Sequence, residues 1–126
     1  MFRETKAFSG FSVNDIPAAR QFYGEVLGLD ARESNDMLEL HVAGGNAVLV
    51  YPKEDHEPAT FTVLNFPVRD IEQAVDELTG KGVSFERYGP DFEQDDKGIA
   101  HNAGPKIAWF KDPAGNVLSV MESDEA

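Results

Sequence analysis

Three histidines and a group of carboxylates have the most chemically versatile side chains of this protein. Glu39 and His41 stand two apart on a predicted strand and so share a face, while His101 follows Asp95 and Asp96 in a long loop. Such side chains act as metal ligands or as general acids and bases. Their spacing matches no metal-ligand motif. The simpler interpretation is a solvated strand face and a solvated loop histidine.

Nucleophilic chemistry has little support in the sequence. Cysteine is absent, which removes thiol nucleophiles, disulfides and cysteine-based metal sites. No Gly-x-Ser-x-Gly motif occurs, and no serine can be paired with a base from sequence alone. His56 lies in the charged stretch 52–58, which is typical of an exposed linker. We assign no catalytic residue, and acid–base work by Glu39, His41 or His101 stays an open alternative.

The charge of the chain restricts its partners. It has 23 acidic and 11 basic side chains and a net charge of −12 at pH 7. Phosphate backbones and anionic lipid surfaces repel such a protein, which argues against nucleic acid and membranes as partners. The first twenty residues carry charges and no apolar signal segment, and no long apolar run follows. We therefore expect a cytoplasmic protein.

One sequence pattern occurs twice, and it fixes the elements that must position these groups. Residues 8–15 and 63–70 alternate apolar and polar positions, and each segment enters an amphipathic helix at an aspartate that suits an N-cap, Asp15 or Asp70. Each helix is followed by three predicted strands, around 31–33, 37–42 and 47–51 in the first copy and 84–88, 107–111 and 117–121 in the second. The second copy is longer, and its extra residues fall within 89–106.

Two local motifs accompany the duplication. A Val-x-Asp segment enters a helix that contains Phe22-Tyr23 and ends at Leu27-Gly28-Leu29, and Asp112-Pro113-x-Gly115-Asn116 precedes the last strand. With the duplication, these motifs resemble the vicinal oxygen chelate superfamily, which includes glyoxalase I, bleomycin resistance proteins, extradiol dioxygenases and fosfomycin resistance enzymes. The resemblance covers about residues 6 to 122.

The resemblance implies an α+β fold. Two βαβββ modules are expected to form a strongly curved eight-stranded mixed sheet around a cup, with the helices outside. We expect one domain, 1–126, with module one at about 6–52, a linker at 53–60 and module two at about 61–122. Members often assemble as homodimers, so a homodimer is expected, and the modules can pair within a chain or between chains.

The resemblance also locates the metal site of the family. Its metal-dependent members take one ligand, usually His, from the first strand of each module and another, usually Glu, from the last strand. In this chain those positions are Phe8, Leu49, Val63 and Ser119. Phe, Val and Leu have no lone pairs, and one Ser hydroxyl cannot hold a divalent ion. We therefore expect neither a metal nor another cofactor.

Strand alternation extends this set to an apolar cup with a few hydrogen-bonding groups. Trp109 is added as a candidate to stack on a ligand, with core packing as the alternative. The predicted ligand-binding cup consists of Phe8, Ser12, Leu49, Val63, Asn65, Trp109, Ser119 and Met121. The long loop is expected to close over the cup, and in it Lys97 and His101 are candidates to meet the ligand.

Three functions fit this pattern. The leading hypothesis is a small-molecule binding protein of the glyoxalase and bleomycin resistance type without the metal site of the family. The alternative is a lyase or isomerase that uses a displaced metal site or side-chain acid–base groups. A third possibility is an interaction subunit whose cup is filled by its own side chains.

Overall fold

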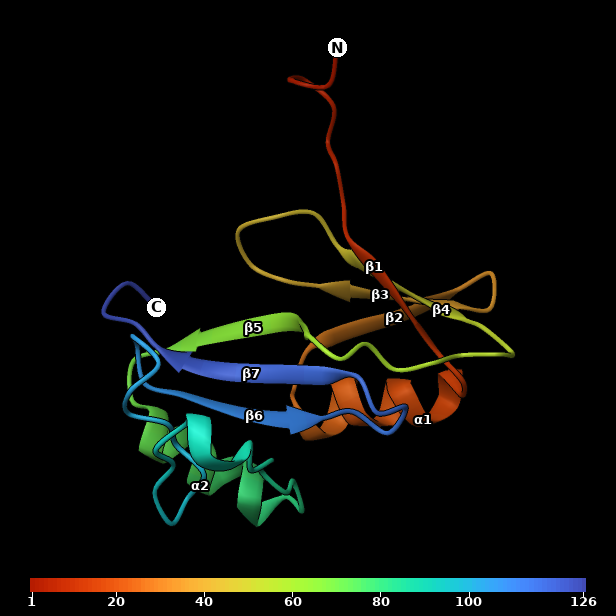
Figure 1. The fold of residues 1–126 in the computed structure, drawn as a ribbon. Coiled ribbons are helices and arrows are strands. Elements are labelled where there is room, and N and C mark those ends of the chain that lie inside the picture. The colour runs from red at the N-terminus through yellow and green to blue at the C-terminus, as the bar shows by residue number, and fades with distance from the viewer. The chain divides into compact units, whose positions relative to one another are not determined.

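The computed structural model describes residues 1–126, which divide into two compact units. Unit 1 comprises residues 1–58 and unit 2 comprises residues 59–126. Each unit has a helix on one face of its own β-sheet (Figure 1). No helix is long and apolar enough to cross a membrane.

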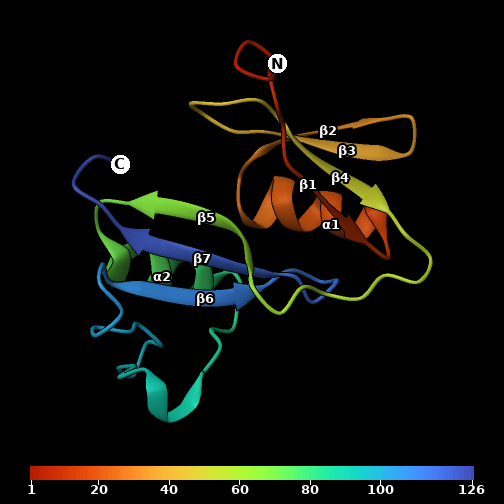
Figure 2. The same cartoon turned by 45° about the horizontal axis from the view of Figure 1, so that its top comes forward.

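Unit 1 has a four-stranded mixed sheet in the order β1-β4-β3-β2, in which β1 runs parallel to β4 and the other pairs are antiparallel. Figure 2 shows the same sheet with α1 beside it. The elements are β1 (Gly10–Val13), α1 (Ile16–Gln21), the π-helical turn η1 (Phe22–Val26), β2 (Asp30–Ser34), β3 (Met37–His41) and β4 (Val48–Pro52).

The predicted cap begins α1. The Asp15 carboxylate accepts a hydrogen bond from the backbone N–H of Ala18 at 3.1 Å, which satisfies a donor that the helix leaves free. The helix then widens into the π-helical turn, where Leu27 N–H donates to Phe22 C=O at 2.9 Å. Tyr23 in this turn is fully buried, and its ring centroid lies 6.0 Å from that of Phe11 on β1. The turn therefore fixes α1 against the sheet.

The two faces of the unit 1 sheet differ in burial. Alternate residues point toward α1 and form the core, namely Phe11, Val13, Leu38, Leu40, Val48 and Val50. The intervening residues, including Ser12, Glu39 and Leu49, lie on the opposite face, which we call the open face of unit 1.

Unit 2 repeats the order of strand, helix and strands. Its sheet has the order β5-β7-β6, with β5 parallel to β7 and β6 antiparallel to β7. Asp70 caps α2 by accepting from Gln73 N–H at 3.1 Å, as predicted, and Ile71 and Val75 of this helix are buried. The elements are β5 (Thr62–Val68), α2 (Ile71–Gly80), the 3₁₀ turn η2 (Gly89–Asp91), β6 (Ile107–Lys111) and β7 (Val117–Glu122).

The α+β fold is as predicted, but the count of strands differs. The structure has seven strands in two sheets instead of eight in one, because the predicted strand at 84–88 pairs with β6 only through a bridge between Phe85 and Phe110. The side chain of Gln94 explains the short pairing. It donates to Glu86 C=O at 2.8 Å and accepts from Tyr88 N–H at 2.8 Å, so it occupies backbone groups that a longer ladder would use.

The long loop of unit 2 extends the sheet. Gln94 bridges Ala100, and Ala100 in turn bridges Ile107 at the start of β6, so residues 93–101 form a small hairpin along the outer edge of β6. The hairpin turns at Gly98, which has a φ of +89°. A Cβ there would lie 3.0 Å from Cβ of Phe85, so this close approach favours glycine.

Candidate ligand-binding site

A pocket of about 260 Å³ lies on the open face of unit 1. Phe8 and Leu49 both line it, so the structure brings together the two module-one positions at which the family carries metal ligands. Glu39 joins them from β3. The full lining consists of Lys6, Phe8, Glu39, Asn46, Ala47 and Leu49. The pocket therefore combines apolar walls with one carboxylate, one amide and one ammonium group.

The strand register explains why these residues meet. Leu49 on β4 stands opposite Gly10 on one side and Glu39 on the other. A Cβ on Gly10 would lie 3.1 Å from the Leu49 carbonyl oxygen and 3.8 Å from the ring of Tyr51, so a larger residue would crowd this stretch of the face. Asn46 donates to Ala7 C=O at 2.7 Å and holds the segment before β1 beside the pocket. Phe8 itself is 66% exposed, which leaves its ring accessible to a ligand.

The polar side chains beside the pocket are arranged around Glu39. Arg32 stands opposite Glu39 in the ladder, but its guanidinium is held by Asp30, with contacts of 3.2 and 2.8 Å. This hydrogen-bonded pairing lowers the pKa of Asp30 and raises the pKa of Arg32. Glu39 instead lies 3.3 Å from Nε2 of His41, a buried atom that makes no hydrogen bond of good geometry. A carboxylate and an imidazole thus stand together on the open face.

Ser12 lies further along the open face, on β1. Its hydroxyl oxygen is 2.7 Å from Nδ1 of His56, which lies in the stretch predicted to be an exposed linker, and the contact is partly buried. The two residues are 44 positions apart, and His56 belongs to no motif, so no local signal in the sequence could have paired them. The charged stretch 52–58 folds back so that its histidine reaches the sheet.

The open face of unit 2, opposite α2, holds most of the second half of the predicted cup. Ser119 is fully buried, and its hydroxyl donates to Oδ1 of Asn65 at 2.5 Å. Met121 pairs with Pro67 next to them. The β5–β7 register shifts between Thr62 and Leu64, which leaves Val63 at a bulge. The structure thus brings Asn65, Ser119 and Met121 together and interrupts the alternation on which the placement of Val63 depended.

Trp109 is packed within unit 2. It is only 9% exposed, and its ring lies 4.9 Å from Phe92 and 5.3 Å from Tyr88 by centroid distance. It also belongs to a buried cluster with Ala100 and Val117. Burial raises the pKa of the Tyr88 phenol. The long loop thus supplies aromatic and aliphatic side chains that cover this part of the face.

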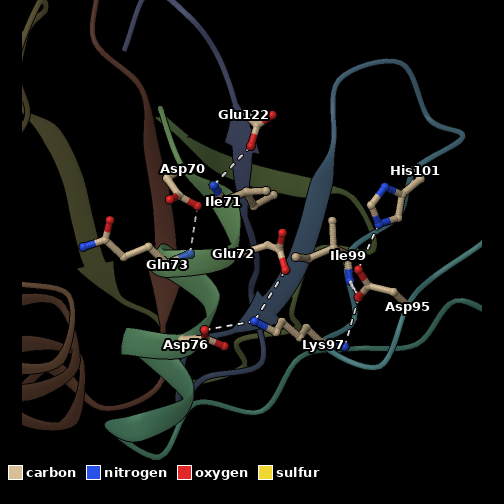
Figure 3. A network of polar contacts seen from close by, with 10 residues as sticks. All are labelled: Asp70, Ile71, Glu72, Gln73, Asp76, Asp95, Lys97, Ile99, His101 and Glu122. Carbon is tan, nitrogen blue, oxygen red and sulfur yellow. Dashed lines mark hydrogen bonds and ion pairs between the residues drawn. The ribbon is translucent and has the colours of Figure 1, made fainter.

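Lys97 and His101 contact unit 2 itself (Figure 3). The Lys97 ammonium lies 2.9 Å from Asp76 and 3.5 Å from Glu72, one turn apart on α2, and the hydrogen bond to Asp76 is the main reason that the pKa of Lys97 is raised. His101 is 2.9 Å from the Asp95 carboxylate. The tip of the hairpin is thus attached to the helix side of the sheet.

Asp95 organises the hairpin from its interior. One carboxylate oxygen accepts from the N–H groups of Lys97 at 2.9 Å and Ile99 at 3.0 Å, and the other meets His101. Burial acts to raise the pKa of Asp95, but the hydrogen bonds from His101, Ile99 and Lys97 outweigh it and hold the pKa below its usual value. The hairpin is therefore most stable when Asp95 is ionised.

The residues at the metal positions of the family do not fit a metal. Phe8, Leu49 and Val63 carry no donor atoms, and the Ser119 hydroxyl is engaged with Asn65. No group of three or more His, Asp or Glu side chains lies together in a way that could hold an ion. We therefore derive no chemical step through a metal at these positions.

Two units of strand, helix and strands, each with its helix on one face of a mixed sheet, define a glyoxalase-type fold. Residues 8–120 match the family model of the Glyoxalase/Bleomycin resistance protein/Dioxygenase superfamily, so the chain belongs to this superfamily and the predicted resemblance is confirmed.

Solved structures agree on the fold. A glyoxalase family protein from Enterococcus faecalis is 23% identical with a TM-score of 0.70 over 97% of this chain and 100% of that chain. TnmS3, an antibiotic binding protein from a Streptomyces species, is 20% identical with a TM-score of 0.67 over 96% and 98%. The fosfomycin resistance protein FosX from Listeria monocytogenes is 11% identical with a TM-score of 0.68 over 93% and 91%. A comparison with curated proteins gives no match.

Proposed function

We propose that this protein binds a small, partly apolar molecule on the open face of unit 1 and does so without the metal ion of its superfamily. The observation that carries the proposal is the pocket that Phe8 and Leu49 share with Glu39. A concave site with apolar walls and a few polar groups is the usual form of a small-molecule site. TnmS3, which has the same fold, is an antibiotic binding protein, and this supports binding as a function of the fold.

The chemistry of the lining supports metal-independent binding. A ligand ring placed against Phe8 and Leu49 removes apolar surface from water, which contributes about 25 cal/mol per Å² of area. Glu39 and Lys6 at the same pocket can orient polar groups of the ligand. None of these interactions requires a Lewis acid.

Metal analysis tests the metal-free part of the proposal. The purified chain is treated with a chelator, titrated with Zn²⁺, Ni²⁺ or Mn²⁺, dialysed and analysed for metal content. We expect no ion to remain at a stoichiometric level. One tightly held ion per chain would contradict metal-free binding and favour a metalloenzyme. Retention of that ion should then require Glu39 and His41.

A thermal-shift screen over small aromatic compounds tests the binding part. A ligand present at about 100 times its Kd stabilises the folded state by about 2.7 kcal/mol, which raises the melting temperature. We expect Leu49→Ala to abolish or weaken the shift of each hit. Met37→Ala is the matched control, because Met37 is 38% exposed on the same sheet and lies outside the pocket. Equal shifts in both variants would place the ligand elsewhere.

A second candidate function is an acid–base enzyme of the same fold, such as a lyase or isomerase. One observation favours it: Glu39 lines the pocket, so a carboxylate that can act as a base faces a bound molecule, and it lies 3.3 Å from Nε2 of His41. If a bound compound is turned over, Glu39→Gln should abolish turnover and retain binding. Retained turnover in Glu39→Gln would exclude this role.

The assembly of the chain is a related proposal. The superfamily resemblance predicts a homodimer, and analytical ultracentrifugation of the full chain measures it directly. A sedimenting species of twice the monomer mass would support the proposal, and a monomer at all concentrations would contradict it.

A further inference from the structure

The contact between Ser12 and His56 has the geometry of a nucleophile beside its base. Oγ of Ser12 lies 2.7 Å from Nδ1 of His56, and the pair is partly buried. Separations of about 2.6 to 3.2 Å allow a histidine to take the proton of an attacking hydroxyl. When the ring proton is on Nε2, Nδ1 is the acceptor and Ser12 donates.

Local structure holds the imidazole in place. His56 N–H donates to Lys53 C=O at 3.1 Å, which closes a turn directly after β4. Within this turn the Lys53 ammonium lies 2.9 Å from Asp55. On the other side, Ser12 is in the middle of β1 and pairs with Tyr51, so its backbone is fixed by the sheet. Both members of the pair are thus carried by ordered backbone.

The pair lies one step along β1 from the ligand pocket. Ser12 and Gly10 share the open face, and Gly10 stands opposite Leu49, which lines the pocket with Phe8. Two residues of a strand span about 6.6 Å. An acyl chain whose apolar end lies between Phe8 and Leu49 can therefore present its carbonyl carbon to Ser12.

We propose that Ser12 and His56 form a catalytic pair that is acylated by activated esters of medium-chain carboxylic acids. Oγ of Ser12 bonds to the carbonyl carbon while its proton passes to Nδ1 of His56. The bond from that carbon to the alcohol oxygen then breaks, and the leaving oxygen takes the proton from His56. Water hydrolyses the acyl-serine in the same way, so that ester and water become acid and alcohol.

This activity goes beyond ligand binding and can fail separately from it. The other serine of the predicted cup, Ser119, is fully buried and donates its hydrogen to Asn65, so it lacks a comparable base. The chain has no cysteine, so no thiol competes for the reagent. Lysines do compete, but they form amides, whereas an acyl-serine is an ester that hydroxylamine cleaves.

The experiment uses p-nitrophenyl hexanoate with the full chain at neutral pH. Release of p-nitrophenol is followed by absorbance, and the quenched protein is digested and mapped by mass spectrometry. We expect a hydroxylamine-sensitive hexanoyl group on the peptide that contains Ser12. Because the mapping is done on the unaltered protein, it gives a result even if a variant fails to fold.

Variants test the nucleophile Ser12 and the base His56 separately. Ser12→Ala should remove the adduct, and His56→Gln, which keeps hydrogen-bonding capacity but accepts no proton, should slow acylation by about 100-fold or more. Ser34→Ala, an exposed serine on β2 of the same sheet, should react like the unaltered chain. Hydroxylamine-resistant adducts on lysines alone, or unchanged acylation in Ser12→Ala or His56→Gln, would overturn the proposal.

Discussion

Units 1 and 2 share one repeated sequence pattern, yet their open faces differ in burial. In unit 1 the face carries a pocket, an exposed Phe8 and a half-exposed Tyr51. In unit 2 the corresponding face has a buried Trp109 under Phe92 and Tyr88. The added residues, within 89–106, supply Phe92 to this cover, and Tyr88 lies just before them. Two copies of one element can therefore differ in burial, with a pocket on one face and a covered surface on the other.

The final turns show the same contrast. In unit 2 the buried Asp112 accepts from Ala114 N–H at 3.0 Å and Asn116 N–H at 2.8 Å and thereby closes the turn before β7. The first copy has Val42 in the position of Asp112, and its turn at 43–46 is exposed. Asn46 there bonds outward to Ala7 and shapes the pocket. The copy without the capping carboxylate is thus the one whose final turn lines a pocket.

The largest change in the free energy of unfolding is expected where the long loop covers the open face of unit 2. Trp109→Ala removes a ring that is only 9% exposed and leaves a cavity among Phe92, Tyr88 and Val117. Such a truncation lowers the free energy of unfolding by about 3 to 5 kcal/mol. Urea denaturation followed by circular dichroism measures it. Tyr51→Ala, on the open face of unit 1, should change the same quantity by less than about 1 kcal/mol; equal losses would contradict the contrast.

A smaller effect is expected at the pocket of unit 1, and it should appear in binding. Phe8→Ala removes a ring that is 66% exposed, so stability should hardly change. Ligand affinity should fall by about tenfold, which corresponds to about 1.4 kcal/mol. Isothermal titration with a hit from the thermal-shift screen measures this loss. Phe61→Ala serves as control, since Phe61 is 69% exposed and does not line the pocket.

Loss of the hydrogen bond between Ser119 and Asn65 should have a smaller effect than the two changes above, and it should appear in stability. Ser119→Ala removes a fully buried donor and is expected to destabilise the chain by about 1 kcal/mol. A chemical denaturation series measures the change. The double variant with Asn65→Ala should lose little more than the single one, because the contact is already gone. Additive losses would mean that the two side chains act independently.

The smallest effect concerns the hairpin of unit 2 in acid. Because the pKa of Asp95 is below its ordinary value near 3.8, its ionisation stabilises the fold at neutral pH. This stability is present above pH 3.8 and disappears as the pH falls through the lower pKa of the folded state. Asp95→Asn should therefore destabilise the chain at pH 7, and the difference from the unaltered chain should shrink as the pH falls below 3.8. Asp96→Asn, next to it, is the control, because Asp96 contributes only its backbone carbonyl to a hydrogen bond and the substitution should hardly change stability at pH 7.

Much of the fold follows from short-range signals. Asp15 and Asp70 both cap the helices that they were predicted to begin, and the alternation of Phe11 with Val13 identifies the buried face of β1. Local signals fail where a distant side chain intervenes. Gln94 occupies backbone groups at 86–88 and shortens the pairing of the predicted strand with β6. This competition depends on the contact of Gln94 with residues 86–88, which local sequence patterns do not predict.

The candidate site is predictable to a similar extent. Phe8 and Leu49, which the superfamily resemblance selects, both line the pocket, although Phe8 lies just before β1 and not on it. Glu39 belongs to the predicted solvated strand face, where its side chain is 45% exposed, and it also lines this pocket. His56 could not be placed, since its approach to Ser12 depends on how the stretch after β4 folds back. Periodicity gives the face of a strand residue, whereas loop residues are positioned only by tertiary contacts.

The strand order of unit 1 leaves β2 at the rim of its sheet. An edge strand of this kind has unpaired backbone N–H and C=O groups that can pair with a strand of another chain, which can lead to aggregation. Here β2 presents Asp30, Arg32 and Glu33 along its length, and all but Ala31 of its residues are exposed. Stacking of copies along this rim would strip these charged side chains of water. The charged side chains of β2 therefore disfavour edge-to-edge aggregation of this sheet.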